Sequence, residues 1–192
     1  MEDKKKLKKE DLIQRLDRHL DWIKSCDTKA SIVIAGAGIF LSIFTAEHSI
    51  NMLNQILTQT IRNINFSNFL YLTLFVISWG GFIHGAYCLV RVLVPMMKKE
   101  VLIYQQDTRL DSLYYFESID DKKFLEFKEK MISETPEEEI EDLLTQIYIN
   151  ARICSAKYSF YRRGIRSIFI GISGVLILYT VGIILLKLGG MG

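Results

Sequence analysis

The sequence has few of the residues from which enzyme active sites and metal centres are built. It contains three histidines, His19, His48 and His84, and they are scattered along the chain. It has no glycine-rich phosphate-binding motif, no HExxH and no CxxC. The sequence therefore offers no catalytic residue, no metal site and no cofactor site, and we expect a protein that is not an enzyme.

The number of cysteines and the net charge are also low. The three cysteines, Cys26, Cys88 and Cys154, are odd in number and lack metal-ligand spacing. This argues against a disulfide framework and predicts small buried residues in a reducing compartment. The formal net charge is only +2, so the chain lacks the global basic field of a nucleic-acid-binding protein. We expect no nucleic-acid partner.

Long apolar runs are abundant instead. Residues 30–46, 69–90 and 167–186 form runs of 17, 22 and 20 residues without Asp, Glu, Lys or Arg. A hydrocarbon core of about 30 Å needs roughly 17 to 25 helical residues to cross it. A soluble helix does not stay apolar on every face for five turns. The sequence therefore predicts an all-α membrane protein with three transmembrane helices.

The distribution of Lys and Arg predicts the orientation of these helices. Residues 1–29 carry nine, residues 47–67 carry only Arg62, and residues 96–165 carry eleven. By the positive-inside rule, the N-terminus and residues 96–165 should be cytoplasmic, and residues 47–67 should be external.

Two further segments have helical periodicity. Within residues 1–29, apolar residues recur at steps of four, four and three, which predicts a cytoplasmic amphipathic helix running into the first span; they are Leu12, Leu16, Leu20 and Ile23. The external segment 47–67 has a similar stripe: Ile50, Leu53, Leu57, Ile61 and Ile64. We interpret the external helix as resting on the outer leaflet, with a role at a pore mouth as the alternative.

The 96–165 segment is predicted to be small and helical. After a short apolar piece at 101–104, a helix should start at Ser118 and run to Met131. A stronger start signal lies at Thr135, Pro136 and Glu138. From there a heptad pattern predicts one long helix that continues into the third span; its positions are Ile140, Leu144, Ile147, Ala151, Cys154, Tyr158, Tyr161 and Ile165. This face would pack on the first helix or on a second copy of the chain.

One ionisable residue, His84, lies well inside an apolar run. Such groups usually face a partner or a cavity. Its imidazole would be neutral and bonded to a neighbouring helix, or it would line a conduction path. Glycines on either side of it predict close helix approach, as do Gly36, Gly38, Gly171 and Gly174.

A candidate ligand site combines residues from three parts of the chain. Gln146, Asn150 and Lys157 fall on one helix face, and Asp27 and Lys29 lie at the cytoplasmic end of the first span. With the aromatic Tyr114, these cationic and amide groups are the kind that a nucleotide's phosphate and base require. The alternative for Asp27 and Lys29 is that they only anchor the helix end.

Several stretches of the sequence resemble the transmembrane effector family of Pycsar antiphage systems. The resemblance covers about residues 16–186 and includes LDWIKSCDTKASIVIAGAGIF and LLTQIYINARICSAKYSFYRRGI. Its most specific residues are Asp27, Thr28, Lys29 and Ala30 in the first stretch, and Gln146, Ile147, Tyr148, Asn150, Lys157 and Tyr158 in the second. It implies a multi-pass protein of the bacterial inner membrane. It also implies a ligand, the cyclic pyrimidine mononucleotide cCMP or cUMP, supplied by a neighbouring phage-activated cyclase. The effector would then impair the inner membrane and cause abortive infection.

Other interpretations remain open at this point. A related class of two-helix effectors from other nucleotide-signalling defence systems shares the general architecture. A membrane scaffold whose heptad face binds partner helices, and a small channel subunit, are the alternatives outside defence. The channel is weakened by the lack of paired acids and bases within the spans. A homo-oligomer is expected for the effector.

Overall fold

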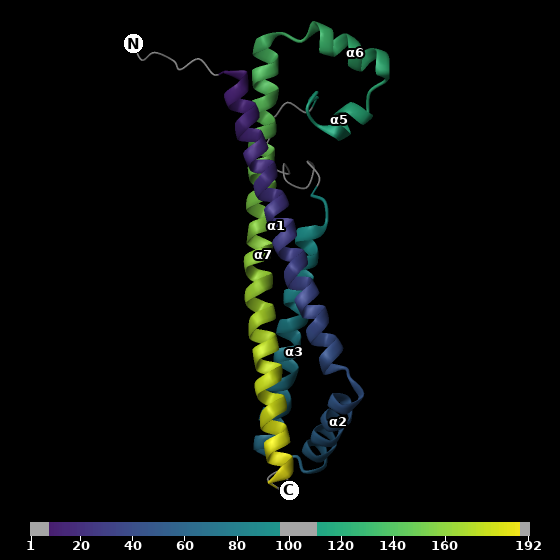
Figure 1. Cartoon of the computed structure of the whole chain (residues 1–192), viewed down its shortest axis with the longest axis vertical. Coiled ribbons are helices and arrows are strands. Elements are labelled where there is room, and N and C mark those ends of the chain that lie inside the picture. Colours follow the sequence, from purple (N-terminus) through teal and green to yellow (C-terminus); the bar gives the residue numbers. More distant parts are fainter. Residues whose placement is uncertain (1–7, 97–110, 189–192) are drawn as a thin grey trace, which may run out of the picture. The chain divides into compact units, whose positions relative to one another are not determined.

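The computed structural model describes residues 8–96 and 111–188 (Figure 1). These residues form helices joined by short connecting segments. The chain divides into two compact units. Unit 1 comprises Met1–Cys26 and Pro95–Lys157, and unit 2 comprises Asp27–Val94 and Tyr158–Gly192. The apolar piece predicted at 101–104 lies outside the described residues.

Three helices are long and apolar enough to cross a membrane: α1 (Lys9–Phe44), α3 (Phe66–Leu93) and α7 (Pro136–Lys187). Each contains one of the predicted apolar runs, except that the first run, 30–46, extends two residues beyond the end of α1. Large apolar side chains face outward along them; Ile32 and Ile170, for example, are 67% and 61% exposed. Lipid is the solvent in which such surfaces are stable. The prediction of an all-α protein with three membrane-spanning helices is confirmed.

The N-terminus of α7 has the predicted capping box. The Thr135 hydroxyl accepts the Glu138 N–H at 3.3 Å, and the Thr135 N–H donates to Glu138 Oε2 at 2.9 Å. Pro136 occupies the first helical position, where its missing N–H costs nothing. Because no later proline interrupts it, α7 continues for 52 residues and includes the third span, as predicted.

The helix predicted to start at Ser118 is wrong. Ser118 instead lies inside the short helix α5 (Phe116–Asp120), and the next helix, α6 (Phe124–Ser133), begins six residues later. The Lys122 ammonium donates to the Ser118 carbonyl at 2.5 Å and also pairs with Asp111. These bonds close α5 after little more than one turn. The capping pattern could not reveal this, because Asp111 lies outside the local sequence window.

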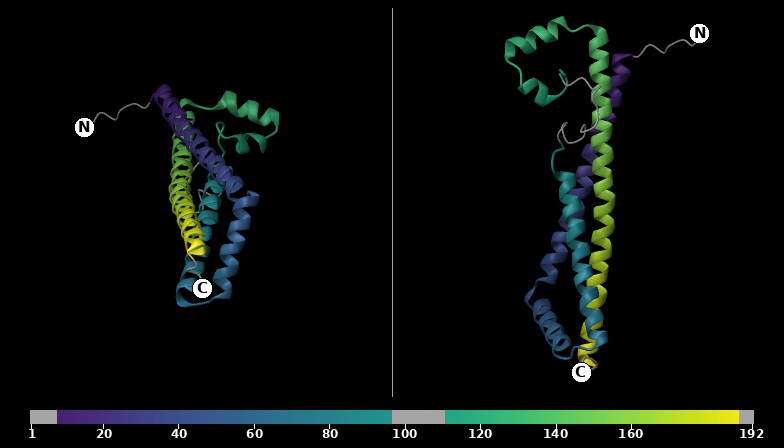
Figure 2. Two further views of the ribbon diagram at one scale, coloured as in Figure 1. Left: turned by 60° about the horizontal axis from the view of Figure 1, so that its bottom comes forward. Right: turned by 180° about the vertical axis from the view of Figure 1, so that it is seen from behind.

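The connecting helix α2 (Glu47–Arg62) forms as predicted (Figure 2). Its buried face overlaps the predicted stripe only in part, because Leu53 packs against the buried Phe44, Phe75 and Val175. Ile56 is fully buried, although it is not part of the predicted stripe, and it packs with Tyr71 of α3 and with apolar residues near the end of α7. Two residues of the predicted stripe, Ile50 and Ile61, are 40% and 56% exposed. Part of the apolar surface of α2 is therefore buried against α3 and α7, and the rest is exposed.

Within unit 2, α3 and α7 approach so closely that glycine is needed at the contact. A Cβ atom built on Gly171 of α7 would lie 2.8 Å from the Phe82 Cα atom of α3. A Cβ atom on Gly85 of α3 would lie 2.5 Å from the α7 backbone. Close packing of small residues is a main source of helix association in lipid. In contrast, a Cβ atom on Gly36 or Gly38 would meet nothing within 4 Å.

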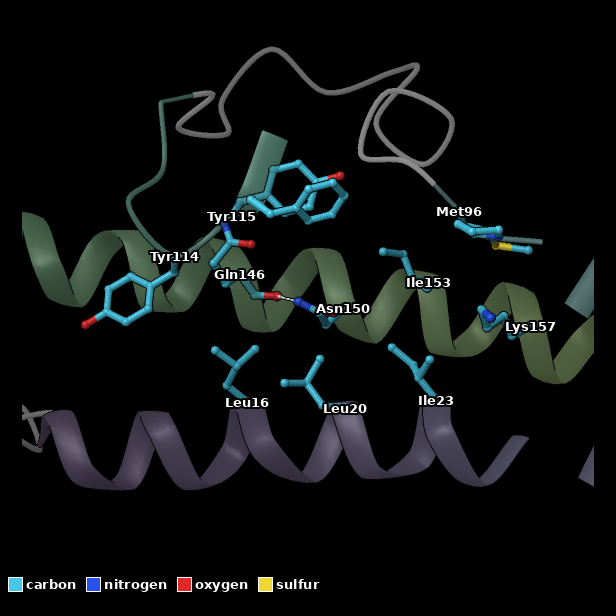
Figure 3. A pocket seen from close by; sticks show the side chains of 12 residues that line it. Leu16, Leu20, Ile23, Met96, Tyr114, Tyr115, Gln146, Asn150, Ile153 and Lys157 are labelled. Atoms are coloured by element: carbon cyan, nitrogen blue, oxygen red, sulfur yellow. Dashed lines mark hydrogen bonds between the residues drawn. The ribbon is translucent and has the colours of Figure 1, made fainter. Parts of the chain in front are cut away.

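In unit 1, the predicted heptad face of α7 is not its most buried face. The fully buried residues include Leu143, Gln146 and Ile149, each one or two positions away from the predicted ones. Leu144, a predicted position, is 41% exposed. The buried face contains polar residues, so a search for apolar periodicity selects its neighbour. The α1 stripe points toward this polar-containing face of α7 (Figure 3). Packing of the predicted heptad face on the first helix or on a second copy stays a prediction.

We predict that Gly171→Ala lowers the melting temperature of the detergent-solubilised protein, whereas Gly36→Ala does not. The added methyl group at Gly171 would meet the α3 backbone, and overpacking costs typically about 1–3 kcal/mol. Both changes bring the same gain in helix propensity, so Gly36→Ala controls for it. Circular dichroism melts measure the difference. Equal melting temperatures for the two variants would show that α3 and α7 are not in close contact.

Candidate functional site

Unit 1 contains a cavity of about 380 Å³, which is within the usual size range of small-ligand sites. Its walls come from α1, α7, the segment before and into α5, and the two residues after Val94 (Figure 3). The lining residues are Leu16, Leu20, Ile23, Pro95, Met96, Tyr114, Tyr115, Phe116, Gln146, Asn150, Ile153 and Lys157. All of them belong to unit 1.

The apolar wall of the cavity is formed by the amphipathic stripe of α1. Leu16, Leu20 and Ile23 recur at helical spacing and point toward α7 (Figure 3). Their helix continues without a break into the first span. The sequence identified this stripe but gave no signal that it would line a cavity.

The α7 wall carries the polar groups. Gln146, Asn150 and Lys157 lie along one face at steps of four and seven, as the sequence predicted. Asn150 Nδ2 donates to the Gln146 carbonyl at 2.9 Å, which turns the amide along the helix surface. Lys157 is only 4% exposed, so its ammonium is held in a largely dehydrated setting. Charges in such a setting interact more strongly with an opposite charge than charges in water do.

The aromatic wall, Tyr114–Phe116, is tied to α7 by a buried carboxylate. Asp142 is fully buried, and its Oδ2 atom accepts the Leu113 N–H at 2.8 Å. The Ser112 hydroxyl, also fully buried, accepts the Tyr114 N–H at 3.0 Å and shapes the local turn. A hydrogen bond from a backbone amide to a buried carboxylate is of the stronger, charge-assisted kind. These contacts fix the backbone at the start of the aromatic segment, whose three residues line the cavity.

A second set of contacts holds the outer end of this wall. The Tyr114 hydroxyl donates to Glu139 Oε1 at 2.8 Å, and Lys9 Nζ lies 2.6 Å from the same oxygen. The hydrogen bonds from Lys9 and Tyr114 lower the pKa of Glu139. Burial, followed by the bond to Glu139, raises the pKa of the Tyr114 phenol. At neutral pH the phenol is therefore the donor and the carboxylate the acceptor.

The chemistry of the cavity suits a small planar molecule that carries negative charge. Three aromatic rings and an aliphatic wall offer stacking surfaces, the amides offer donors and acceptors, and Lys157 offers a cation. No group of three His, Cys, Asp or Glu side chains placed to hold a metal ion occurs within residues 8–96 and 111–188. The cavity walls hold no activated nucleophile with a neighbouring base among these residues.

The structure brings together four of the six predicted ligand residues: Tyr114, Gln146, Asn150 and Lys157. Asp27 and Lys29 are not part of the cavity wall, and both belong to unit 2. The Asp27 carbonyl accepts the Ser31 hydroxyl within α1 at 3.0 Å, a contact of the kind expected at a helix surface. Ligand binding by all six residues stays a prediction.

Three lining residues had no signal in the sequence. Pro95 and Met96 follow the second span in the sequence, and no local pattern relates them to α7. Ile153 lies beside the predicted heptad positions and was not selected for that reason.

His84, predicted to have a role in the membrane, is bonded to a neighbouring helix. Its Nδ1 atom lies 3.2 Å from Ser167 Oγ of α7, and its Nε2 atom lies 3.7 Å from Cys88 Sγ one turn along α3. This agrees with the interpretation of His84 as an interhelical polar contact. Its involvement in the membrane function stays a prediction. Cys88, like Cys26 and Cys154, is buried and free of disulfide bonds, as the sequence predicted.

Comparison with known proteins assigns the chain to a family. The model of the Pycsar effector protein domain matches residues 11–186. The chain is also 30% identical over 164 residues to the Pycsar effector protein GmPycTM of Gulbenkiania mobilis, covering 82% of this chain and 84% of that protein. A search of solved structures finds no significant match. On this evidence the chain belongs to the Pycsar transmembrane effector family.

Proposed function

We propose that this antiphage effector binds a cyclic pyrimidine mononucleotide, cCMP or cUMP, and responds by impairing the inner membrane, so that the infected cell stops growing. The nucleotide would come from a neighbouring cyclase, and the effector itself would catalyse no reaction. Membership of the effector family and the three spans support this proposal. The cavity in unit 1 is the proposed ligand site.

The observation that carries the proposal is the composition of the cavity wall. A cyclic mononucleotide has a planar base and one phosphate anion. The aromatic rings of Tyr114–Phe116 would stack on the base, and the amide of Gln146 or Asn150 would bond its polar edge. Lys157, near the end of the cavity where Met96 lies, would pair with the phosphate (Figure 3).

The same wall suggests how binding reaches the membrane. Every spanning helix contributes to it or adjoins it: α1 and α7 each supply residues directly, and Pro95 follows the end of α3. A ligand that binds one arrangement of these segments better than another shifts the population toward that arrangement. Because α1 and α7 are continuous, a change at the cavity is carried along the helices into the spans.

The proposal requires unit 1 to be cytoplasmic and α2 to be external, which is the orientation predicted from the charges. We predict that Gln55→Cys on α2 reacts with a membrane-impermeant maleimide in intact cells. Lys128→Cys on α6 should react only after permeabilisation. Both positions are exposed, whereas the native cysteines are buried. Reaction of Lys128→Cys, but not Gln55→Cys, from outside would invert the orientation and place the cavity outside the cell.

We also propose a homo-oligomer that uses the predicted heptad face of α7. In the single chain this face is half-exposed, and it carries apolar residues such as Leu144, which is 41% exposed. Neighbouring Tyr148 is 37% exposed. Apolar side chains on a helix surface are available to a second copy of the same helix.

We predict that Leu144→Asp lowers the mass of the detergent-solubilised assembly, whereas Glu141→Lys does not. Aspartate at position 144 would be tolerated in a single chain, because the site is exposed, but would be desolvated without a partner in an oligomer. Light scattering coupled to size exclusion measures the mass. A wild-type protein that already runs as a monomer would contradict the proposed assembly.

The ligand proposal predicts that Lys157→Met weakens binding of cCMP or cUMP by about 10- to 100-fold, as expected when a hydrogen bond to a charged group is lost. Methionine keeps the apolar length of this buried side chain, which alanine would not. Calorimetric titration of the full-length protein measures binding, and a membrane-potential dye measures depolarisation in cells. Lys128→Met, which removes an exposed lysine of α6, is the control.

The outcomes separate function from site. A wild-type protein that binds neither nucleotide would remove the ligand-gated effector, and the scaffold alternative would then be preferred. Normal binding by a folded Lys157→Met variant would keep the function but reject Lys157 as the phosphate partner. Loss of binding in both lysine variants would indicate a general effect of positive charge, not the cavity.

A further inference from the structure

Two arginines from different helices share one aromatic ring in unit 2. The Arg163 guanidinium carbon lies 4.8 Å from the centre of the Phe160 ring, and that of Arg91 lies 5.8 Å from it. Arg91 is in the last turn of α3, and the other two residues are on α7. Arg163 is also fixed by bonds of 3.3 Å from Nε and Nη2 to the Ser159 carbonyl and hydroxyl. Both guanidiniums therefore lie within cation–π range of the same ring.

This cluster, Arg91, Phe160 and Arg163, lies at the polar edge of two spans. Arg91 directly follows the apolar run 69–90, and Arg163 comes shortly before the run 167–186. Arg162 and Arg166 add two more cations to the same stretch of α7. Lipid phosphates are found at this depth in a bilayer, where charged side chains and aromatic rings collect.

Unit 2 supplies little negative charge to balance the cluster. Its sequence contains seven Lys and Arg residues but only two acids, Asp27 and Glu47. Two guanidiniums that approach one ring repel each other, and an anion bound at the cluster would offset that repulsion. Arginine presents planar N–H pairs that match the oxygens of a phosphate.

The surface next to the cluster suits a lipid better than a soluble phosphate compound. Along α3, the turns leading to Arg91 expose large apolar side chains: Ile83, Tyr87 and Val90 are 63%, 60% and 49% exposed. An acyl chain attached to a bound phosphate would lie along this surface. A soluble anion would leave it uncovered. The two features together therefore select a lipid as the occupant.

We propose that the cluster of Arg91, Phe160 and Arg163 binds the phosphate of an anionic phospholipid headgroup. The lipid would join the end of α3 to α7 at the membrane surface. None of its three residues lines the proposed nucleotide cavity, whose lining residues all belong to unit 1. It also does not depend on the proposed response to a nucleotide.

Native mass spectrometry of the full-length protein, with palmitoyl-oleoyl phosphatidylglycerol or phosphatidylcholine added, tests the proposal. The wild-type protein should retain phosphatidylglycerol in preference to phosphatidylcholine. In the double variant Arg91→Gln/Arg163→Gln, the ratio of retained phosphatidylglycerol to phosphatidylcholine should fall about tenfold, since each arginine near the membrane surface contributes to anionic-lipid attraction. Arg62→Gln/Lys187→Gln, which removes two exposed charges from the other end of the spans, should keep it.

Three results would overturn the proposal. The first is equal retention of the two lipids by the wild-type protein. The second is an equal loss of the preference for phosphatidylglycerol in both double variants. The third is release of phosphatidylglycerol by millimolar inorganic phosphate or by cCMP, which would assign the cluster to a soluble anion. Should Arg91→Gln/Arg163→Gln fail to fold by circular dichroism, Phe160→Leu provides the test. It removes the ring between the arginines while keeping an apolar side chain, and it should also reduce the preference.

Discussion

The close contact between α3 and α7 is the interaction on which the membrane part of this protein depends. Lipid tails are as apolar as leucine, so burial of apolar surface does little to hold helices together within a bilayer. Contact between backbones has to supply the attraction. Gly85 and Gly171 permit that contact, and the Tyr71 hydroxyl, which donates to the Leu178 carbonyl at 2.9 Å, adds a polar bond along the same interface. Such an interface is specific because a single added methyl group would clash with the facing backbone.

If the protein binds a ligand as proposed, this interface would also limit how it can respond. α7 carries both the polar wall of the cavity and the glycines that contact α3, and it is one uninterrupted helix. Any rotation of the spanning part of α7 would turn Gly171 away from Phe82 and bring a bulkier side chain toward α3. Packed interfaces change between discrete arrangements and do not deform gradually. A glycine contact of this kind is therefore suited to a switch between two states of the spans.

The sequence predicts the elements of the fold well, because strong and local signals determine them. Apolar length identifies the three spans, and the capping box at Thr135 places the start of α7. Which face each helix buries is predicted less well. On α2 the buried Ile56 lies outside the apolar stripe, and on α7 the buried face includes Gln146. In both places the partner helix decides the buried face, and no local pattern encodes the partner.

The candidate site was predicted in part for the same reason. Tyr114, Gln146, Asn150 and Lys157 could be grouped by residue type and helical spacing, but the role of Asp142 in holding the aromatic wall depends on a contact 29 residues away in the chain. The buried polar groups of α7 are costly for a helix interface, because apolar residues of similar size would pack there without desolvating an amide or an ammonium. The neighbouring heptad face of α7 carries apolar residues that could pack against a helix, yet the polar residues are the ones that line the cavity. A helix that binds a polar ligand needs polar groups in this position.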